Sequence, residues 1–98
     1  AVLNRAKMDD TDLSAANLNG ADLSGVDLYR AELNGADLND AILRDADLYR
    51  AELTGADLSG VDLKGVADLI GITATNLRSC PSSLPYGWDC EKNSLIKR

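Results

Sequence analysis

The chain of 98 residues contains no histidine and no phenylalanine, and only two cysteines, two prolines and four aromatic residues. Without histidine it lacks the commonest general base and the commonest zinc ligand. Without phenylalanine an aromatic-centred core is not expected, and two cysteines are too few for a disulfide framework. No apolar run approaches the roughly 20 residues of a membrane-spanning helix, and no segment has the pattern of a signal peptide.

Basic side chains are also scarce. Ten lysines and arginines face 16 acidic residues, which gives a net charge of -6 and an isoelectric point near 4.4. Nucleic acids and anionic membranes are bound through basic surfaces, so neither partner is expected. The composition therefore favours a small acidic domain in the cytoplasm, or in the periplasm or thylakoid lumen if the N-terminus is processed.

What the chain has in abundance is a five-residue repeat. Thirteen quintets follow one another from residue 1 to residue 65, and the third residue of each is leucine except at Met8. The first residue is small, the second is acidic in nine quintets, and the fifth is glycine in six. The leucines of the third to the thirteenth quintet are predicted to form the core: Leu13, Leu18, Leu23, Leu28, Leu33, Leu38, Leu43, Leu48, Leu53, Leu58 and Leu63.

A period of five fits neither a helix nor a continuous strand. Five helical residues advance the chain by about 140°, which would scatter the leucines around the axis. In a strand, successive leucines would point to opposite faces. The chain is therefore expected to turn once per quintet, with the first and third residues inward and the acidic second residue outward. Glycine suits the corner because it tolerates a positive φ.

A longer repeat indicates how many corners close one coil. Residues 26–35 read VDLYRAELNG and residues 46–55 read ADLYRAELTG, an offset of 20 residues or four quintets. Four sides per coil would place Tyr29 beside Tyr49 and Arg30 beside Arg50, with Asp10 one coil away from Arg30. Duplication without geometric meaning is the alternative explanation.

The repeat resembles that of the pentapeptide-repeat family, whose members repeat A(D/N)LXX. This resemblance covers residues 1–65 and implies an all-β fold, a right-handed quadrilateral parallel β-helix of about four coils. Residues 1–79 would form the β-helix, regular to residue 65 and degenerate from the inserted Val66 onward. Residues 80–98 would form a C-terminal cap, and their LPYGWDC segment is similar to a tail found in cyanobacterial members.

Within the predicted cap, Cys80 and Cys90 have two alternative states. They either form a disulfide that closes a small loop, or remain reduced thiols packed as small hydrophobic side chains. A short strand that starts within residues 84–90 is expected to pair with residues 93–96, with Glu91 and Lys92 near the turn. No cofactor or metal site is expected, because two cysteines without histidine are not enough ligands.

Two functions are compatible with these patterns. The first is a non-enzymatic protein-binding or scaffolding module, with Tyr29, Arg30, Tyr49 and Arg50 as a contact stripe because tyrosine and arginine are favoured at interfaces. Self-association as a homodimer through an open N-terminal coil edge is a further expectation. An enzyme is not expected, because the repeated carboxylates have equivalent, solvated environments.

The second function follows from the resemblance, because some family members mimic DNA and inhibit type II topoisomerases such as gyrase. B-DNA carries one charge per about 1.7 Å, so a rod of about 19 Å would need about 11 negative charges. The repeats carry 13 acidic and 6 basic residues, a net charge of -7. Outward aspartates that solubilise the rod and suit its bends explain the acidity as well.

Overall fold

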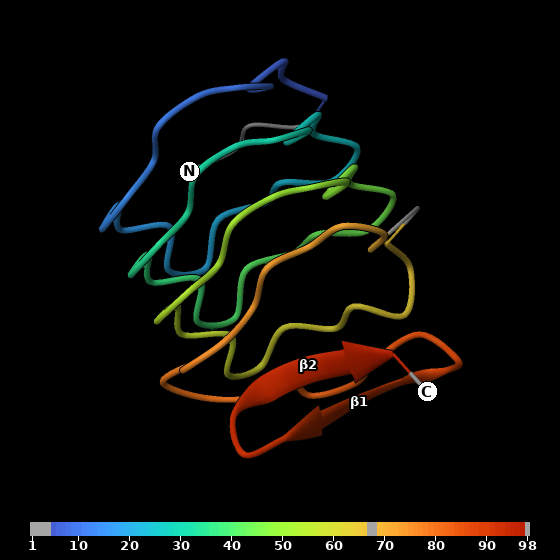
Figure 1. Ribbon diagram of the computed structural model, residues 1–98. Coiled ribbons are helices and arrows are strands. Elements are labelled where there is room, and N and C mark those ends of the chain that lie inside the picture. The colour runs from blue at the N-terminus through green and yellow to red at the C-terminus, as the bar shows by residue number, and fades with distance from the viewer. Residues whose placement is uncertain (1–4, 67–68, 98) are drawn as a thin grey trace.

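A computed structural model describes residues 5–66 and 69–97 of the chain. The described residues contain no α-helix and form a stack of coils, with a two-stranded hairpin of strands β1 (Trp88–Glu91) and β2 (Ser94–Lys97) against the last coil. Figure 1 shows the coils lying one above another from the blue to the orange part of the chain. The molecule measures 30 × 23 × 22 Å along its principal axes.

The coils are joined by single-residue parallel bridges. Second residues of quintets pair with residues 20 positions later, as in Asp12 with Glu32 and Glu32 with Glu52. Four quintets therefore separate paired residues along the regular part of the chain. Past the inserted Val66 the separation becomes 21 or 22 residues, and the last bridge joins Asp62 to Ser83. The parallel pairing thus extends beyond residue 79, into the segment predicted to be a cap.

Each corner from Arg5 to Gly60 is a turn with one left-handed residue. The N–H of the first residue of a quintet donates to the carbonyl of the preceding leucine, as Ala36 does to Leu33 at 3.0 Å. The fifth residues from Arg5 to Gly60 have φ between 58° and 76°, whereas the fourth residues have none above zero. A positive φ at the third position of the turn alone is the type II pattern. Glycine is usual at such positions, but arginine, aspartate or alanine occupies seven of these twelve corners.

The corner at Ala15 gives a direct test of this backbone geometry. Ala15 has φ 61° and an exposed side chain. Ala15→Gly should raise the free energy of unfolding by about 0.5–1 kcal/mol, because the relief of left-handed strain exceeds the added entropy of glycine in the unfolded chain. Urea unfolding measures the change. Ser14→Gly, one residue earlier and without a positive φ, is the control and should be destabilising; equal effects at both positions would contradict the explanation.

The interior consists of the inward first and third residues. Nine leucines from Leu23 to Leu63 are at most 2 % exposed, and the small first residues between them are equally buried. Leu13 and Leu18, predicted as core residues, are only half-buried and pack against this core beside Met8. The difference arises because no described coil covers them on the N-terminal side. The core is therefore densest in the middle coils.

The C-terminal hairpin lies against the opposite end of the stack. Strands β1 and β2 pair antiparallel, with Trp88 opposite Lys97, and the turn residues Lys92 and Asn93 both have positive φ, as a type I′ hairpin requires. The N–H of Leu95 donates to Ala74 O at 2.9 Å. Leu95 is buried, and Trp88 packs against the core. The hairpin thus satisfies backbone groups at the edge of the last coil.

Candidate functional site

The four residues of the Tyr–Arg stripe (Tyr29, Arg30, Tyr49 and Arg50) are brought together at one corner of the stack. The Tyr29 and Tyr49 rings are stacked, with centroids 5.4 Å apart and planes inclined by 6°. The Arg50 guanidinium carbon lies 5.5 Å from the centroid of the Tyr49 ring, a cation–π distance. One coil further on, Ile70 is 52 % exposed, and its carbonyl accepts the Arg50 N–H. Half-buried tyrosines, exposed arginines and Ile70 therefore form a continuous column at the surface.

The arginines of the stripe retain accessible guanidinium groups. Arg30 Nε lies 3.7 Å from Asp10 Oδ1, which confirms the predicted proximity of these residues across one coil. The two side chains are 55 % and 66 % exposed, so solvent screens the pair and its contribution to folding is small. Among the described residues no carboxylate is buried, so neither arginine is needed to neutralise one. Both guanidinium groups remain exposed to solvent.

Beside the stripe lies a charged groove, defined by Asp10, Arg30, Glu32, Arg50, Glu52 and Gly71, with a volume of about 540 Å³. Gly71 has φ +75°, and a Cβ there would lie 2.8 Å from Arg50 Cγ, so glycine leaves room for the arginine. Asn34 Nδ2 donates to Glu52 Oε1 at 3.1 Å. Within the described residues, the guanidiniums of Arg30 and Arg50 form no ion pair within 4.0 Å with Glu32 or Glu52. Charges of both signs are thus exposed side by side.

Most outward aspartates have a structural role at the corners. Their Oδ1 accepts the N–H two residues later, as in Asp27 with Tyr29 at 3.0 Å and Asp47 with Tyr49 at 2.9 Å. Hydrogen bonds to the carboxylate favour its ionised form. The Ser14 hydroxyl and N–H lower the pKa of Asp12 from its ordinary value. These Asx turns explain the repeated aspartate by backbone geometry, independently of any partner.

Two further carboxyl groups show the same effect. The N–H and then the hydroxyl of Ser59 lower the pKa of Asp57. At Asp62 the Lys64 N–H lowers the pKa most, followed by the hydroxyl of Ser83. All three perturbed carboxyl groups are therefore held ionised by corner hydrogen bonds, an arrangement that offers no raised-pKa general acid.

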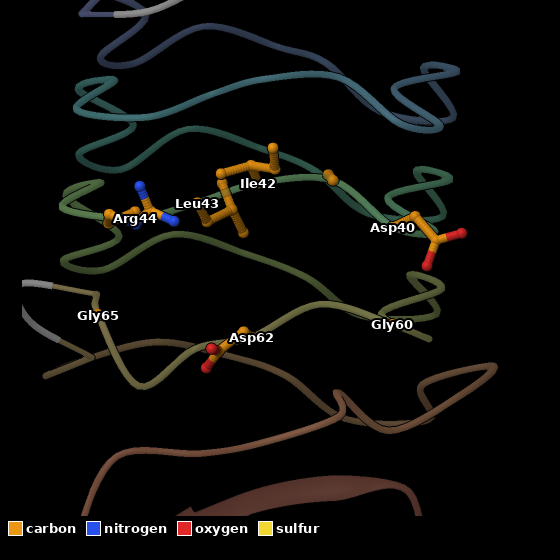
Figure 2. A pocket seen from close by; sticks show the side chains of 8 residues that line it. Asp40, Ile42, Leu43, Arg44, Gly60, Asp62 and Gly65 are labelled. Atoms are coloured by element: carbon orange, nitrogen blue, oxygen red, sulfur yellow. The ribbon is translucent and has the colours of Figure 1, made fainter.

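Sequence reasoning missed a second surface feature around Ile42. This isoleucine takes the place of an aspartate between Asp22 and Asp62 in its column and is 43 % exposed. Figure 2 shows it between the side chains of Arg44 and Asp40, above Asp62. The pocket here has a volume of about 210 Å³. The signal was present in the sequence, because Ile42 is an apolar residue at a position that is acidic in nine of the thirteen quintets.

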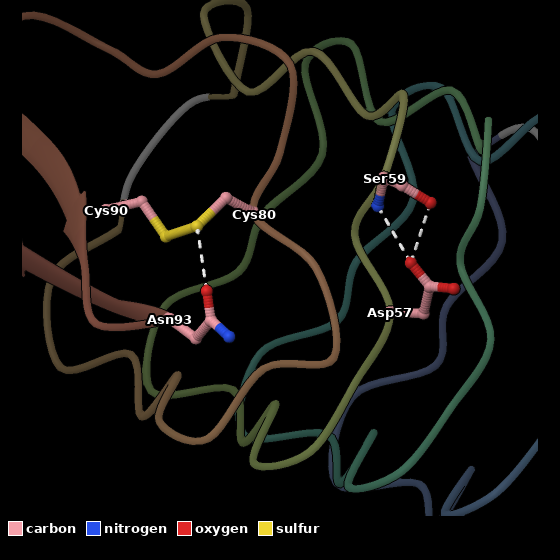
Figure 3. The surroundings of a disulfide bond; sticks show 5 residues. All are labelled: Asp57, Ser59, Cys80, Cys90 and Asn93. Atoms are coloured by element: carbon pink, nitrogen blue, oxygen red, sulfur yellow. Dashed lines mark hydrogen bonds between the residues drawn. A yellow bond between two sulfur atoms is a disulfide. The ribbon is translucent and has the colours of Figure 1, made fainter.

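Cys80 and Cys90, whose state the sequence left open, form a disulfide with Cα atoms 6.2 Å apart. Figure 3 shows the bond linking Cys80 in the last coil to Cys90 in strand β1. The Cys80 Sγ lies 3.7 Å from Asn93 Oδ1, so the disulfide and the hairpin turn are adjacent. Tyr86, between the cysteines, is fully exposed.

No helix in residues 5–66 and 69–97 is long and apolar enough to cross a membrane. These described residues also contain no group of three or more cysteine, aspartate or glutamate side chains that could hold a metal ion.

Stacked coils with a five-residue repeat, one leucine per side and an Asx turn at most corners define a β-helical repeat protein. The model of the pentapeptide repeats matches residues 6–45 and 27–65, with eight copies. The chain belongs to the pentapeptide-repeat family, whose fold is a right-handed β-helix. Proteins of this family are generally non-enzymatic structural or binding modules.

Solved structures of similar proteins agree with this assignment. A pentapeptide repeat protein from Nostoc Pcc 7120 is 32% identical over 90% of this chain and 77% of its own, with a TM-score of 0.60. Rfr23 from the cyanobacterium Cyanothece 51142 is 29% identical over 87% of this chain, with a TM-score of 0.56, and this chain spans 60% of its length. No curated protein matches the chain in sequence.

A third similar structure shares the fold alone. QnrB1, a plasmid-mediated fluoroquinolone resistance protein, is 23% identical over 63% of this chain and 40% of its own, with a TM-score of 0.51.

Proposed function

We propose that the chain is a non-enzymatic protein-binding or scaffolding module that uses the Tyr–Arg stripe as its contact surface. The observation that carries the proposal is the stacked pair Tyr29 and Tyr49 beside exposed guanidiniums. Rigid tyrosines present a large contact area at low entropic cost, and arginine and tyrosine dominate binding energy at interfaces. Burial of an aromatic pair in the core would serve stability, whereas these rings lie at a corner of the surface.

The proposed scaffold is the quadrilateral form with about four coils, from residue 1 to residue 79, capped by residues 80–98. The 20-residue offset between bridged residues supports four sides per coil. The contacts of the hairpin with Ala74 and Leu77 support a capping role for the C-terminal segment. The proposed edge contact through the first coil includes residues 1–4, which lie outside the described residues.

A DNA mimic that inhibits a type II topoisomerase is the competing function, and the charges disfavour it. Duplex DNA as long as the 30 Å dimension of the molecule would carry about 18 charges, against a net charge of -6 here. Many of the acidic groups also serve as turn acceptors. A DNA supercoiling assay with a bacterial gyrase separates the two functions, because inhibition at micromolar concentration would favour mimicry over the stripe.

The proposed compartment follows from the disulfide. Such bonds persist in oxidising environments and are rare in a reducing cytosol. The Cys80–Cys90 bond therefore supports the periplasm or the thylakoid lumen over the cytoplasm as the place where the protein works.

The contact role of the stripe is tested by truncating both tyrosines. Tyr29→Ala with Tyr49→Ala should abolish co-purification of a binding protein from lysate of the source organism, because both aromatic anchors are lost while the core is intact. Quantitative mass spectrometry compares the proteins captured by the wild type and by the variant.

The matched control is Asn19→Ala with Asn39→Ala, which changes the same turn position in two successive coils on another corner. It should leave capture unchanged. Capture that survives in a folded double-tyrosine variant, as judged by circular dichroism, would refute the stripe as the contact surface.

A further inference from the structure

We propose that the charged groove binds a second copy of this chain, in a side-by-side dimer whose two rods point the same way. The inference rests on the proposed function, because it names the partner of the surface that includes Arg30 and Arg50. It is carried by the arrangement of charges in the groove.

The groove contains two rows of opposite charge that run along the stack. Arg30 and Arg50 occupy the same corner in successive coils, and Arg30 donates its N–H to Tyr49 O in the coil below. Glu32 and Glu52 form the neighbouring row and are bridged to each other. Both rows line one groove, so they face solvent in the same direction.

Two such rows are complementary to themselves under one symmetry operation. A two-fold axis parallel to the stack and midway between the rows places each arginine opposite a glutamate of the other copy at the same level. A two-fold axis across the rows would instead place like charges together. The first operation also keeps the coils in register, because both copies share the strand spacing of about 4.8 Å.

Two of the other three sides do not offer this complementarity in the middle coils. One column carries Asp27 and Asp47, and another carries Asp37 and Asp57. Two copies that met through either column would oppose like charges, which is unfavourable. The third side also places the exposed Arg44 beside Asp62, but Ile42 interrupts its row of acids. The arginines of the charged groove lack glutamate partners within their own chain among the described residues.

The available area fits a reversible dimer. A side of 30 by 22 Å offers roughly 660 Å² per copy, which places the total near the lower end of standard interfaces. At the first level the geometry sets Asp10 opposite the partner's Asp12, so the favourable contacts come from the two middle levels. The dimer should therefore depend on protein concentration.

The experiment is sedimentation equilibrium on the full oxidised chain and on two charge-reversed variants. Arg30→Glu with Arg50→Glu makes both rows negative, and Glu32→Arg with Glu52→Arg makes both rows positive. Each variant alone should have a dimer dissociation constant raised by about tenfold or more, because like charges then oppose each other. An equimolar mixture of the two should form a heterodimer at least as tight as the wild-type dimer.

The matched control is Arg44→Glu with Lys64→Glu, which makes the same change in net charge in successive coils at another corner; Arg44 and Lys64 are both exposed. It should dimerise like the wild type. A wild-type chain that is monomeric at millimolar concentration, a mixture that stays monomeric, or a control that dissociates equally would each overturn the proposal. If the dimer is absent but the double-tyrosine variant still loses a captured protein, this inference fails while the proposed function stands.

Discussion

Replacing Leu38 by alanine should lower the free energy of unfolding by about 3–4 kcal/mol. Leu38 is fully buried in the middle of the stack, and the rigid coils above and below it cannot collapse into the space that its side chain leaves. The loss combines the transfer free energy of the removed atoms with the cost of the cavity. Urea denaturation followed by circular dichroism measures the change, with an unaltered m-value as evidence that two-state unfolding is retained.

The matched control for Leu38 is Leu13→Ala, the same substitution at the same repeat position in the first coil. Leu13 is half-buried and already borders solvent, so its truncation removes less buried surface and leaves a smaller cavity. We expect less than about half of the Leu38 effect. Equal losses at the two positions would mean that the first coil is as well covered as the middle of the stack.

Removal of the disulfide is expected to have the second large effect. Cys80→Ser with Cys90→Ser should lower the free energy of unfolding by about 2.5–3 kcal/mol, because the unfolded chain is released from a closed loop. The bonded residues are 10 positions apart and connect the last coil to β1. The hairpin would then be held to the coil chiefly by the buried Leu95 and by its hydrogen bonds to Ala74 and Leu77. Thermal unfolding measures the global change, and amide exchange at Leu77 and Leu95 measures the local one.

Reduction of the wild type provides the internal control for this second result. Dithiothreitol should bring the wild type to the stability of the double-serine variant and leave the variant itself unaffected. Faster exchange should be confined to the hairpin and the last coil, with the middle coils protected. A wild type whose stability is insensitive to reduction would show that the hairpin packs equally well without its covalent link.

The repeat predicted the coil register because each side requires one large and one small inward residue. The side-by-side placement of Tyr29 and Tyr49 followed from the 20-residue offset alone. The irregular end was less predictable. The inserted Val66 accounts for the increase in the separation of bridged residues from 20 to 21. At Ser79 the separation is 22, and at Ser83 it is 21 again. Asn76, with φ 50°, lies five residues after Gly71 and keeps the left-handed corner, so the additional shift arises after it, before Ser79.

The sequence predicted which residues form the candidate surface, but not how their side chains are arranged. The positions of Arg30 and Arg50 followed from the repeat, whereas the stacking of the rings and the exposure of both charge rows depend on side-chain rotamers. Ile42 was overlooked because its neighbours obey the acidic pattern, and a single apolar departure on an outward position resembles ordinary surface variation.

The 20-residue register also determines how inserted repeats change the direction in which a surface faces. Duplication of 20 residues lengthens the rod by one level and leaves every corner aligned with those above it. Duplication of a single quintet adds only one side, so everything downstream turns by one corner relative to everything upstream. Tyr49 would then leave the corner of Tyr29, although each leucine would still point inward. Genes for such proteins can therefore change the direction in which a surface faces without any substitution in the core.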